Sequence, residues 1–452
     1  MNRVRRASQF SEISWIAALF GTAVGAGILY LPLQVGAALW ALVLLSFLVF
    51  PLIYFAHRSI VTLLCMEEAT RDYSGVVAHH LGRTIGVATV VVYFVTFYAV
   101  LTSYSIGLNA NIGAYLFREG ITATNWAKGP YLSLIILFCF GLLHMVGQQA
   151  LLRVMTLLAS ILVVSLLGIS IYLIPFWDFS TVRQMPSPTG LTADVLMVLP
   201  ILTFSFVYFP AMSSMLAAYR SSGAVQGSQA EAHLQRIVLK TSAMLLIFVL
   251  FFVYSCIFSL TAAEFQHAID ENLNCLMILS QKEGISPALA NMGALVGIAA
   301  LLTSFVGVFF AVRDSAHELI GHIRRRWSIE TRSANTDRKR MDRFILVFIV
   351  LTVWGATTAE PSVLNAFGLV ISPLVAVFIF ILPVVILVKA RGWRTLRSPA
   401  YLFILCTGLL ILCSYELGSM LKGSLIEYKS SQKRRSRIMA HPSWTIPRKL
   451  AA

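Results

Sequence analysis

Charged residues are scarce in this sequence. Only 12% of its 452 residues are charged, whereas 58% are hydrophobic, and the mean hydropathy is +0.79. A water-soluble chain of this length would need more polar surface, so lipid is the solvent that the composition fits. Within a bilayer the backbone must satisfy its own hydrogen bonds, which leaves helices or a closed barrel. Because the apolar runs are continuous rather than alternating, they predict an all-α polytopic membrane protein.

Several chemical signatures are also missing. The six cysteines form no CxxC pair and mostly fall inside apolar runs, so we expect neither a disulfide framework nor a metal site. No phosphate-binding loop of the form GxxxxGK is present, which argues against a primary pump. No nucleophile, base or metal cluster indicates an enzyme, and no cofactor is expected. The net charge of +15 does not indicate nucleic-acid binding, because the basic residues lie between apolar runs.

The apolar runs predict about eleven spans, each near the roughly 20 residues needed to cross a bilayer. They form a transmembrane domain over residues 13–420, with a first repeat at about 13–176, a second at about 194–388 and an extra helix at 399–420. A cytoplasmic segment 1–12 and a basic disordered tail 421–452 flank this domain. The spans are expected at about 13–31, 36–56, 85–117, 131–146, 151–176, 194–219, 239–261, 287–311, 344–357, 362–388 and 399–420.

Lysine and arginine set the expected orientation. They cluster after the sixth, eighth and tenth predicted spans, which places those loops and the N-terminus in the cytoplasm. The loop after the seventh span is mainly acidic and falls outside. The basic tail conflicts with this order, because eleven spans place it outside. Either the count is off by one, or the tail escapes the charge bias because earlier spans dominate.

Two predicted spans contain residues that break helices. The first carries GTAVGAGILYLP over residues 21–32, and the sixth has prolines at both ends of the stretch 200–210. First and sixth are the positions of paired discontinuous helices in a five-plus-five inverted repeat. Half-helix ends at mid-membrane present N–H groups to anions and carbonyls to cations. A packing role for the first span stays open, since Gly21 and Gly25 also form a GxxxG motif.

These stretches resemble a known family. Residues 21–32 resemble the first-helix signature of the hydroxy and aromatic amino acid permeases, with the serine and threonine permeases as the nearest branch. The stretch TFSF at 203–206 resembles the sixth helix of that branch, and TSFVG at 303–307 resembles the eighth. The resemblance covers about residues 10–420. It implies the fold of the amino acid–polyamine–organocation superfamily and the import of an amino acid through the bacterial inner membrane with protons.

The resemblance also implies site residues. The glycine segment of the first span would give N–H groups to the substrate carboxylate, and the carbonyls of 203–206 would face its ammonium. Tyr98 and Tyr104 are six residues apart, so at most one is expected to reach the site. The predicted substrate-binding residues are Thr22, Gly25, Ala26, Gly27, Tyr98, Tyr104, Thr203, Phe204, Ser205 and Phe206.

The sequence specifies the coupling ion less well than the substrate-binding residues. Thr303 and Ser304 match the place where related carriers bind sodium, and hydroxyl oxygens are suitable cation ligands. A proton relay needs an ionisable group in the membrane, for which Asp314 is the first choice. The predicted ion-coupling residues are therefore Thr303, Ser304 and Asp314.

Four hypotheses about the function follow from these patterns. The first is a proton-coupled importer of a small amino acid resembling serine or threonine. The second is an exchanger of an amino acid against a metabolic product, and the third is a sodium-coupled or aromatic amino acid permease. A non-transporting sensor or scaffold is the fourth, but it gives no reason for two broken helices. The expected partners are the amino acid, a proton or sodium ion and the lipid bilayer, with no nucleic acid.

Overall fold

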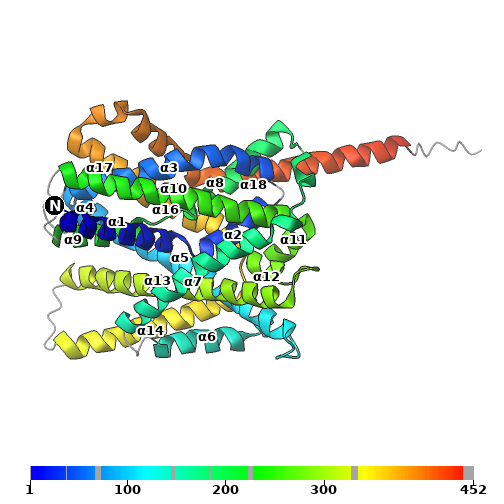
Figure 1. The fold of residues 1–452 in the computed structure, drawn as a ribbon, viewed down its shortest axis with the longest axis horizontal. Coiled ribbons are helices and arrows are strands. Elements are labelled where there is room, and N and C mark those ends of the chain that lie inside the picture. The colour runs from blue at the N-terminus through cyan, green and yellow to red at the C-terminus, as the bar shows by residue number, and fades with distance from the viewer. Residues whose placement is uncertain are drawn as a thin grey trace, which may run out of the picture.

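The chain forms a bundle of long helices that run roughly along one axis (Figure 1). The computed structural model describes residues 2–36, 38–66, 73–143, 148–183, 185–221, 228–326 and 334–440, and these residues contain helices and no strand. The N-terminus, α4, α9 and α17 lie at one end of the bundle, and α11 and α12 lie at the other. We call these the N-terminal end and the α11 end.

The element order follows the predicted two halves. The first half contains α1 (Asn2–Ala23), α2 (Ala26–Val35), α3 (Leu39–Cys65), α4 (Tyr73–Leu81), α5 (Arg83–Arg118), α6 (Pro130–Leu143) and α7 (Gln148–Tyr172). The second half contains α8 (Pro188–Phe204), α9 (Met212–Ser221), α10 (Ser228–Ser259), α11 (Ala262–Asp270), α12 (Cys275–Leu279), α13 (Pro287–Arg326), α14 (Ala334–Thr358), α15 (Val363–Ala366), α16 (Ser372–Ala376) and α17 (Leu382–Arg391). The extra helix is α18 (Pro399–Ala440), and two π-helical turns, Phe367–Ile371 and Val377–Ile381, flank α16.

The described helices confirm a multi-pass, all-α membrane protein. Eight of them are long and apolar enough to cross a bilayer, and the bent pair formed by α1 and α2 makes nine. Shorter apolar stretches, Pro130–Phe140 and Ser160–Tyr172, lie where the fourth and fifth spans were expected. Both halves have the same order: a broken span, a long helix, one or two short helices and a second long helix. This order fits the predicted inverted repeat.

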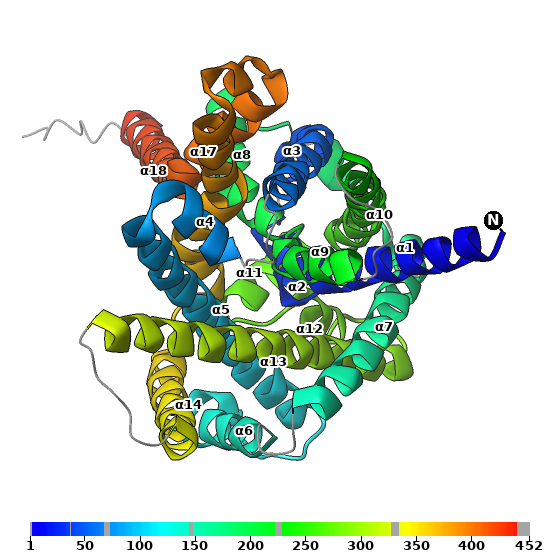
Figure 2. The same ribbon diagram turned by 90° about the vertical axis from the view of Figure 1, so that its left-hand side faces the viewer.

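The interior is organised around α2. This short helix lies near the middle of the bundle (Figure 2) and contacts α8, α10, α12 and α13. Nine of its ten residues are buried, including Tyr30 and Pro32. The long helices α5 and α13 pack along one another beside it. The core is continuous from one end of the bundle to the other because almost every helix adds apolar residues to it.

The predicted end of the second span is wrong. The second span was expected to end at residue 56, but α3 continues to Cys65 and keeps His57, Ser59 and Thr62 buried. The reason is packing: this final stretch lies against α10, so its polar side chains find partners inside the bundle.

The C-terminal tail also differs from the structure predicted for it. Residues 421–440, expected to be disordered, extend α18, which leaves the bundle at the α11 end (Figure 1). Lys422 Nζ lies 3.1 Å from Asp194 Oδ1 near the start of α8, so an ion pair ties the first part of this extension to the bundle. Its Lys, Arg, Leu and Gln residues are also good helix formers. Residues 441–452 lie outside the described part of the chain.

Candidate functional site

The first span is broken at its glycines. The helix α1 ends at Ala23, Val24 and Gly25 form a bend, and α2 starts at Ala26 at an angle of 53°. A new helix start leaves backbone N–H groups without intrahelical acceptors. One of them, the Ala26 N–H, donates to Ser304 Oγ at 3.0 Å. The predicted first-span signature and the predicted eighth-span motif therefore meet directly.

The glycines permit this close approach. A Cβ atom at Gly25 would lie 2.6 Å from Ser304 Oγ, and one at Gly27 would lie 2.9 Å from Cε1 of the Phe204 ring. Neither side chain could be added without displacing a neighbour. Gly21 is different, because no other atom lies within 4 Å of its Cβ position. Gly21 and Gly25 thus do not form a simple GxxxG helix-packing face in the structure.

The sixth span is broken opposite the first. The helix α8 ends at Phe204, residues 205–208 leave regular helix, and a short 3₁₀ turn, Phe209–Ala211, leads into α9. The Ser205 hydroxyl lies 2.9 Å from the Ile201 carbonyl oxygen and 3.3 Å from that of Gly27. The two discontinuous helices therefore face each other at their unwound residues, with Gly27 between Ser205 and Phe204.

The structure brings together six of the predicted site residues in direct contact: Gly25, Ala26, Gly27, Phe204, Ser205 and Ser304. Thr203 lies beside them on α8, but its hydroxyl donates to the Leu199 carbonyl at 2.8 Å. Phe206 is fully buried in the core. Thr303 donates to Ala300 of its own helix at 3.0 Å.

Three predicted residues lie away from this contact region. Thr22 is exposed and donates back to Ala18 at 2.8 Å. Tyr98 packs its ring on Phe94, one turn earlier on α5. The Asp314 side chain is 60% exposed and is paired with Arg313 at 2.8 Å. It follows Ser304 by ten residues on α13, which corresponds to about 15 Å along a helix.

An aromatic cluster covers one side of the breaks, and its centre was not predicted. The ring of Phe367 lies 5.0 Å from that of Phe204, 6.0 Å from Tyr30 and 6.2 Å from Tyr104. Tyr104, rather than Tyr98, is thus the tyrosine of α5 near the site. Phe367 starts a π-helical turn, a feature frequent at functional sites. The only hint in the sequence is the Gly368 and Pro373 pair inside the tenth span.

A buried histidine touches the other side of the sixth-span break and was missed as well. His57 on α3 is 0% exposed, and its Nε2 atom accepts from the Tyr208 N–H at 3.4 Å. The two rings stack with centroids 3.8 Å apart. The predicted end of the second span at residue 56 places His57 outside the membrane, where a histidine does not indicate a buried site.

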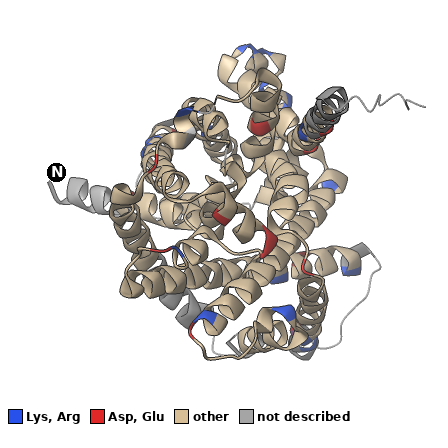
Figure 3. Cartoon of the chain, turned by 90° about the vertical axis from the view of Figure 1, so that its right-hand side faces the viewer, with Lys and Arg blue, Asp and Glu red and all other residues tan. Residues whose placement is uncertain are grey.

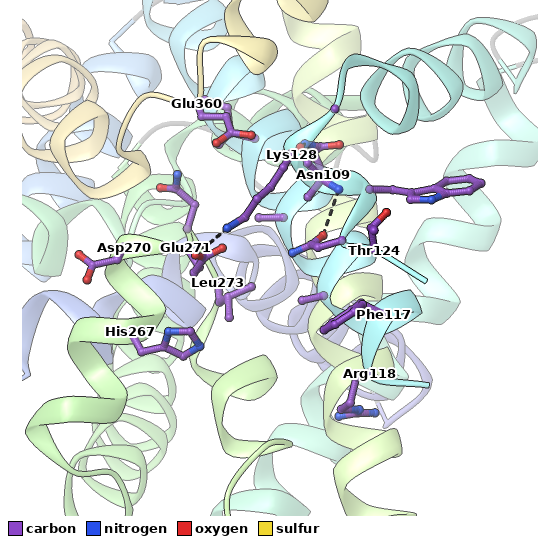
Figure 4. Close-up of a pocket in the computed structure, with 18 of the residues that line it drawn as sticks. Asn109, Phe117, Arg118, Thr124, Lys128, His267, Asp270, Glu271, Leu273 and Glu360 are labelled. Atoms are coloured by element: carbon purple, nitrogen blue, oxygen red, sulfur yellow. Dashed lines mark hydrogen bonds and ion pairs between the residues drawn. The ribbon is translucent and has the colours of Figure 1, made fainter. Parts of the chain in front are cut away.

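A cavity of about 1300 Å³ opens at the α11 end (Figure 4). Its lining includes Arg118, Lys128, His267, Glu271 and Asn272, and an ion pair of 3.3 Å joins Lys128 to Glu271. The Tyr30 hydroxyl of α2 donates to the Asn272 carbonyl at 3.3 Å. One side chain therefore links the broken span to the wall of this cavity.

The short helix α11 at the edge of this cavity is firmly capped. Thr261 and Glu264 form a capping box, and Lys282 lies 3.3 Å from the Glu264 carboxylate. Burial alone would raise the pKa of Glu264, but the hydrogen bonds from Thr261 and the charge of Lys282 outweigh it and lower the pKa below its ordinary value. The carboxylate is thus charged, and the cap intact, at neutral pH.

The residues that match known proteins span most of the chain. Residues 11–414 match the model of the tryptophan/tyrosine permease family. The serine transporter SdaC of Escherichia coli strain K12 is 27% identical over 399 residues, which cover 86% of this chain and 90% of that protein. The inner membrane transport protein YqeG of the same strain is 27% identical over 405 residues, covering 88% and 96%. A probable serine transporter of that strain is 26% identical, covering 89% and 91%.

Solved structures agree on the fold. A mutant of the manganese transporter of Eremococcus coleocola superposes with a TM-score of 0.51 at 14% identity, covering 91% of this chain and 92% of that one. This likeness concerns the fold alone. The described residues contain no group of three His, Cys, Asp or Glu side chains that could hold a metal ion. With its two opposed helix breaks, the chain is a membrane transporter rather than an enzyme, and it belongs to the tryptophan/tyrosine permease family of amino acid transporters.

Proposed function

We propose that the chain imports a small hydroxy amino acid, serine or threonine, through the bacterial inner membrane by proton symport with alternating access. The observation that carries the proposal is the meeting of the two helix breaks, where Ser205 reaches the Gly27 carbonyl and Ser304 holds the Ala26 N–H. Of the relatives that cover most of the chain, one is named a serine transporter and another a probable serine transporter.

The site would recognise a zwitterion through helix ends. The start of α2 is the positive end of a helix dipole, and its Ala26 and Gly27 N–H groups would bind the carboxylate. The end of α8 is a negative end, so carbonyls of 203–206 would face the ammonium. Ser304, whose hydroxyl accepts the Ala26 N–H, would release that N–H to the carboxylate. Both charges of the substrate would then meet complementary backbone groups.

The size of the substrate follows from the aromatic cluster. The Phe204 ring lies directly over Gly27, and Phe367 backs it at 5.0 Å. Aromatic rings this close to the backbone groups favour a side chain as small as that of serine. The competing candidate is an aromatic amino acid, which the same rings could stack on if Phe204 rotated away.

The orientation follows the charge distribution. Acidic residues lie near the middle of the α11 end (Figure 3), where α11 and the turn after it carry Glu264, Asp270 and Glu271. Basic residues of α17 and the following turn, Lys389, Arg391 and Arg394, mark the N-terminal end. Since cytoplasmic loops are enriched in Lys and Arg, the N-terminus would be cytoplasmic and the α11 end would face outward.

Transport into liposomes tests this function. The purified protein is reconstituted, and uptake of labelled serine, threonine, alanine, tryptophan and tyrosine is measured with a proton gradient alone, a sodium gradient alone or unlabelled amino acid inside. We expect serine or threonine uptake driven by the proton gradient. Uptake driven only by sodium, only by internal amino acid, or confined to aromatic substrates would each select another mechanism. A lack of transport for every amino acid would contradict the proposal.

A further inference from the structure

The protonation state of His57 can be read from its partners. Its Nδ1 atom lies 2.9 Å from the Ile53 carbonyl oxygen, which can only accept, so Nδ1 carries the hydrogen of the neutral ring. The lone pair is therefore on Nε2, where it accepts from the Tyr208 backbone N–H at 3.4 Å. The nearly parallel stacking of the two rings, 14° apart, holds this geometry in place.

The partner of His57 is the last residue of the unwound segment in the sixth span. Tyr208 is itself fixed to α10, because its hydroxyl lies 2.8 Å from Ser242 Oγ and 3.4 Å from the Val238 carbonyl. Three residues earlier, Ser205 contacts Gly27 of the first break. A movement of the segment 205–208 at the histidine would thus reach the candidate substrate site along a short stretch of backbone.

Few other titratable groups surround His57. On its own helix α3, Tyr54 precedes it by one turn, and Arg58 follows it as an exposed residue. On α10, Glu231 is engaged by Thr62 and Gln235 further along the bundle. On α17, Lys389 and Arg391 are exposed at the helix end. Among the described residues, none of these charged groups forms an ion pair with the imidazole.

We propose that His57 carries the transported proton on Nε2, and that this proton displaces the Tyr208 N–H and so couples proton binding to the geometry of the sixth-span break. The inference rests on the proposed function and names its coupling residue. It replaces Asp314, which is exposed and distant, as the candidate for that role.

The step needs no co-reactant. A proton from water adds to the Nε2 lone pair, and both ring nitrogens then become donors. The Tyr208 N–H would face another N–H group, so the hydrogen bond is lost and the two groups repel. Either the ring or the segment 205–208 must move, and the proton leaves to water when the original bond forms again. Because His57 is fully buried here, proton exchange requires another conformation, as alternating access demands.

A histidine that served only packing would behave differently on substitution. His57→Gln keeps an amide oxygen that can accept from Tyr208 but cannot be protonated. The matched control is His233→Gln on α10, since His233 also stacks on a tyrosine, Tyr219, but is only half-buried near the N-terminal end. Both variants are reconstituted with the wild type, and serine uptake and serine counterflow are measured with and without a pH gradient.

In the wild type and in the control, a one-unit pH gradient should raise serine accumulation about tenfold for one proton per substrate. His57→Gln should keep counterflow but lose this accumulation, giving equal concentrations inside and outside. A His57→Gln protein that still accumulates serine about tenfold would overturn the inference. If the wild type itself moves no amino acid, or responds only to sodium, the proposed function fails instead, and the coupling role fails with it.

A second variant keeps the test decisive if His57→Gln does not fold. The chain has nine histidines, so the other eight can be replaced by glutamine while His57 is retained. This protein should still accumulate serine in response to a pH gradient. Counterflow without any response to the gradient would show that another histidine couples the proton and would contradict the inference.

Discussion

The two helix breaks are built in opposite ways. The break in the first span depends on missing side chains, because Ser304 and Phe204 occupy the space that Cβ atoms at Gly25 and Gly27 would need. The break in the sixth span depends on side chains that are present, since Ser205 bonds Gly27 and His57 accepts the Tyr208 N–H. The first is therefore sensitive to added volume, and the second to the loss or protonation of a polar group.

This difference suggests that the two breaks serve different functions, one in binding the ligand and the other in responding to the proton. A glycine break with neighbours in contact offers backbone groups to a ligand but contains nothing that titrates. A break held by an imidazole can change with proton binding. The contact between Ser205 and Gly27 joins them, so binding at one break and protonation at the other can influence each other.

The largest effect is expected from filling the first break. Gly25→Leu or Gly27→Leu would push a side chain into Ser304 or Phe204, and we expect loss of serine uptake with normal membrane insertion. Gly21→Leu is the matched control, because its Cβ position has no atom within 4 Å. Uptake in reconstituted liposomes and the yield of folded protein measure both. Normal transport by a Gly25 or Gly27 variant would remove this break from the site.

A smaller effect is expected from Ser304→Ala. This change leaves the buried Ala26 N–H without its acceptor, which costs about 1–3 kcal/mol. We expect a change of about tenfold or more in the apparent affinity for serine. Thr303→Ala, which removes a hydroxyl bonded only within α13, should have a much weaker effect. Equal effects, or a loss of sodium dependence in the Thr303 variant, would instead support a sodium site on α13.

The aromatic cluster should control which amino acids are accepted. Phe367→Leu removes the ring that backs Phe204, so we expect larger substrates to be taken up better relative to serine. Competition of unlabelled leucine and phenylalanine against labelled serine measures the change. Tyr98→Phe is the control, since Tyr98 packs on Phe94 away from the breaks. An unchanged competition profile for the Phe367 variant would separate the cluster from substrate selection.

The smallest effect concerns the cap of α11, at the edge of the cavity. Thr261→Ala removes the capping hydroxyl and should destabilise the helix by about 1 kcal/mol, giving about fivefold faster amide exchange in α11. The lowered pKa of Glu264 means that the cap contributes stability at neutral pH and loses it as pH falls through the folded-state pKa. The protection factor of the α11 amides, which is the intrinsic exchange rate at each pH divided by the observed rate, should therefore fall on acidification in the wild type. A pH-independent protection factor would contradict this assignment.

The sequence predicted the breaks better than the groups around them. Glycines and prolines within apolar runs are local signals, so the bend at Gly25 and the end of α8 at Phe204 could be expected from composition alone. The contact of Ala26 with Ser304 joins residues 278 positions apart, and it was not predicted, although both stretches resemble one family.

Other features depend on tertiary contacts that leave no local pattern. His57 looks like the start of a polar loop because Arg58 follows it, yet α10 and the 205–208 segment bury it. Phe367 is one aromatic residue among many, and only the π-helical turn brings it to Phe204 and Tyr104. Asp314 is exposed on α13 and paired with Arg313, a position that the sequence pattern did not indicate.

The most direct test of the central claim is an experimental structure of the protein with bound serine, determined by electron cryomicroscopy. We expect the serine carboxylate within hydrogen-bond distance of the Ala26 and Gly27 N–H groups, with the Ser304 hydroxyl displaced from Ala26. The ammonium should face the carbonyls of 203–206. Serine bound only in the cavity at the α11 end, with the Ala26 to Ser304 bond intact, would contradict the account.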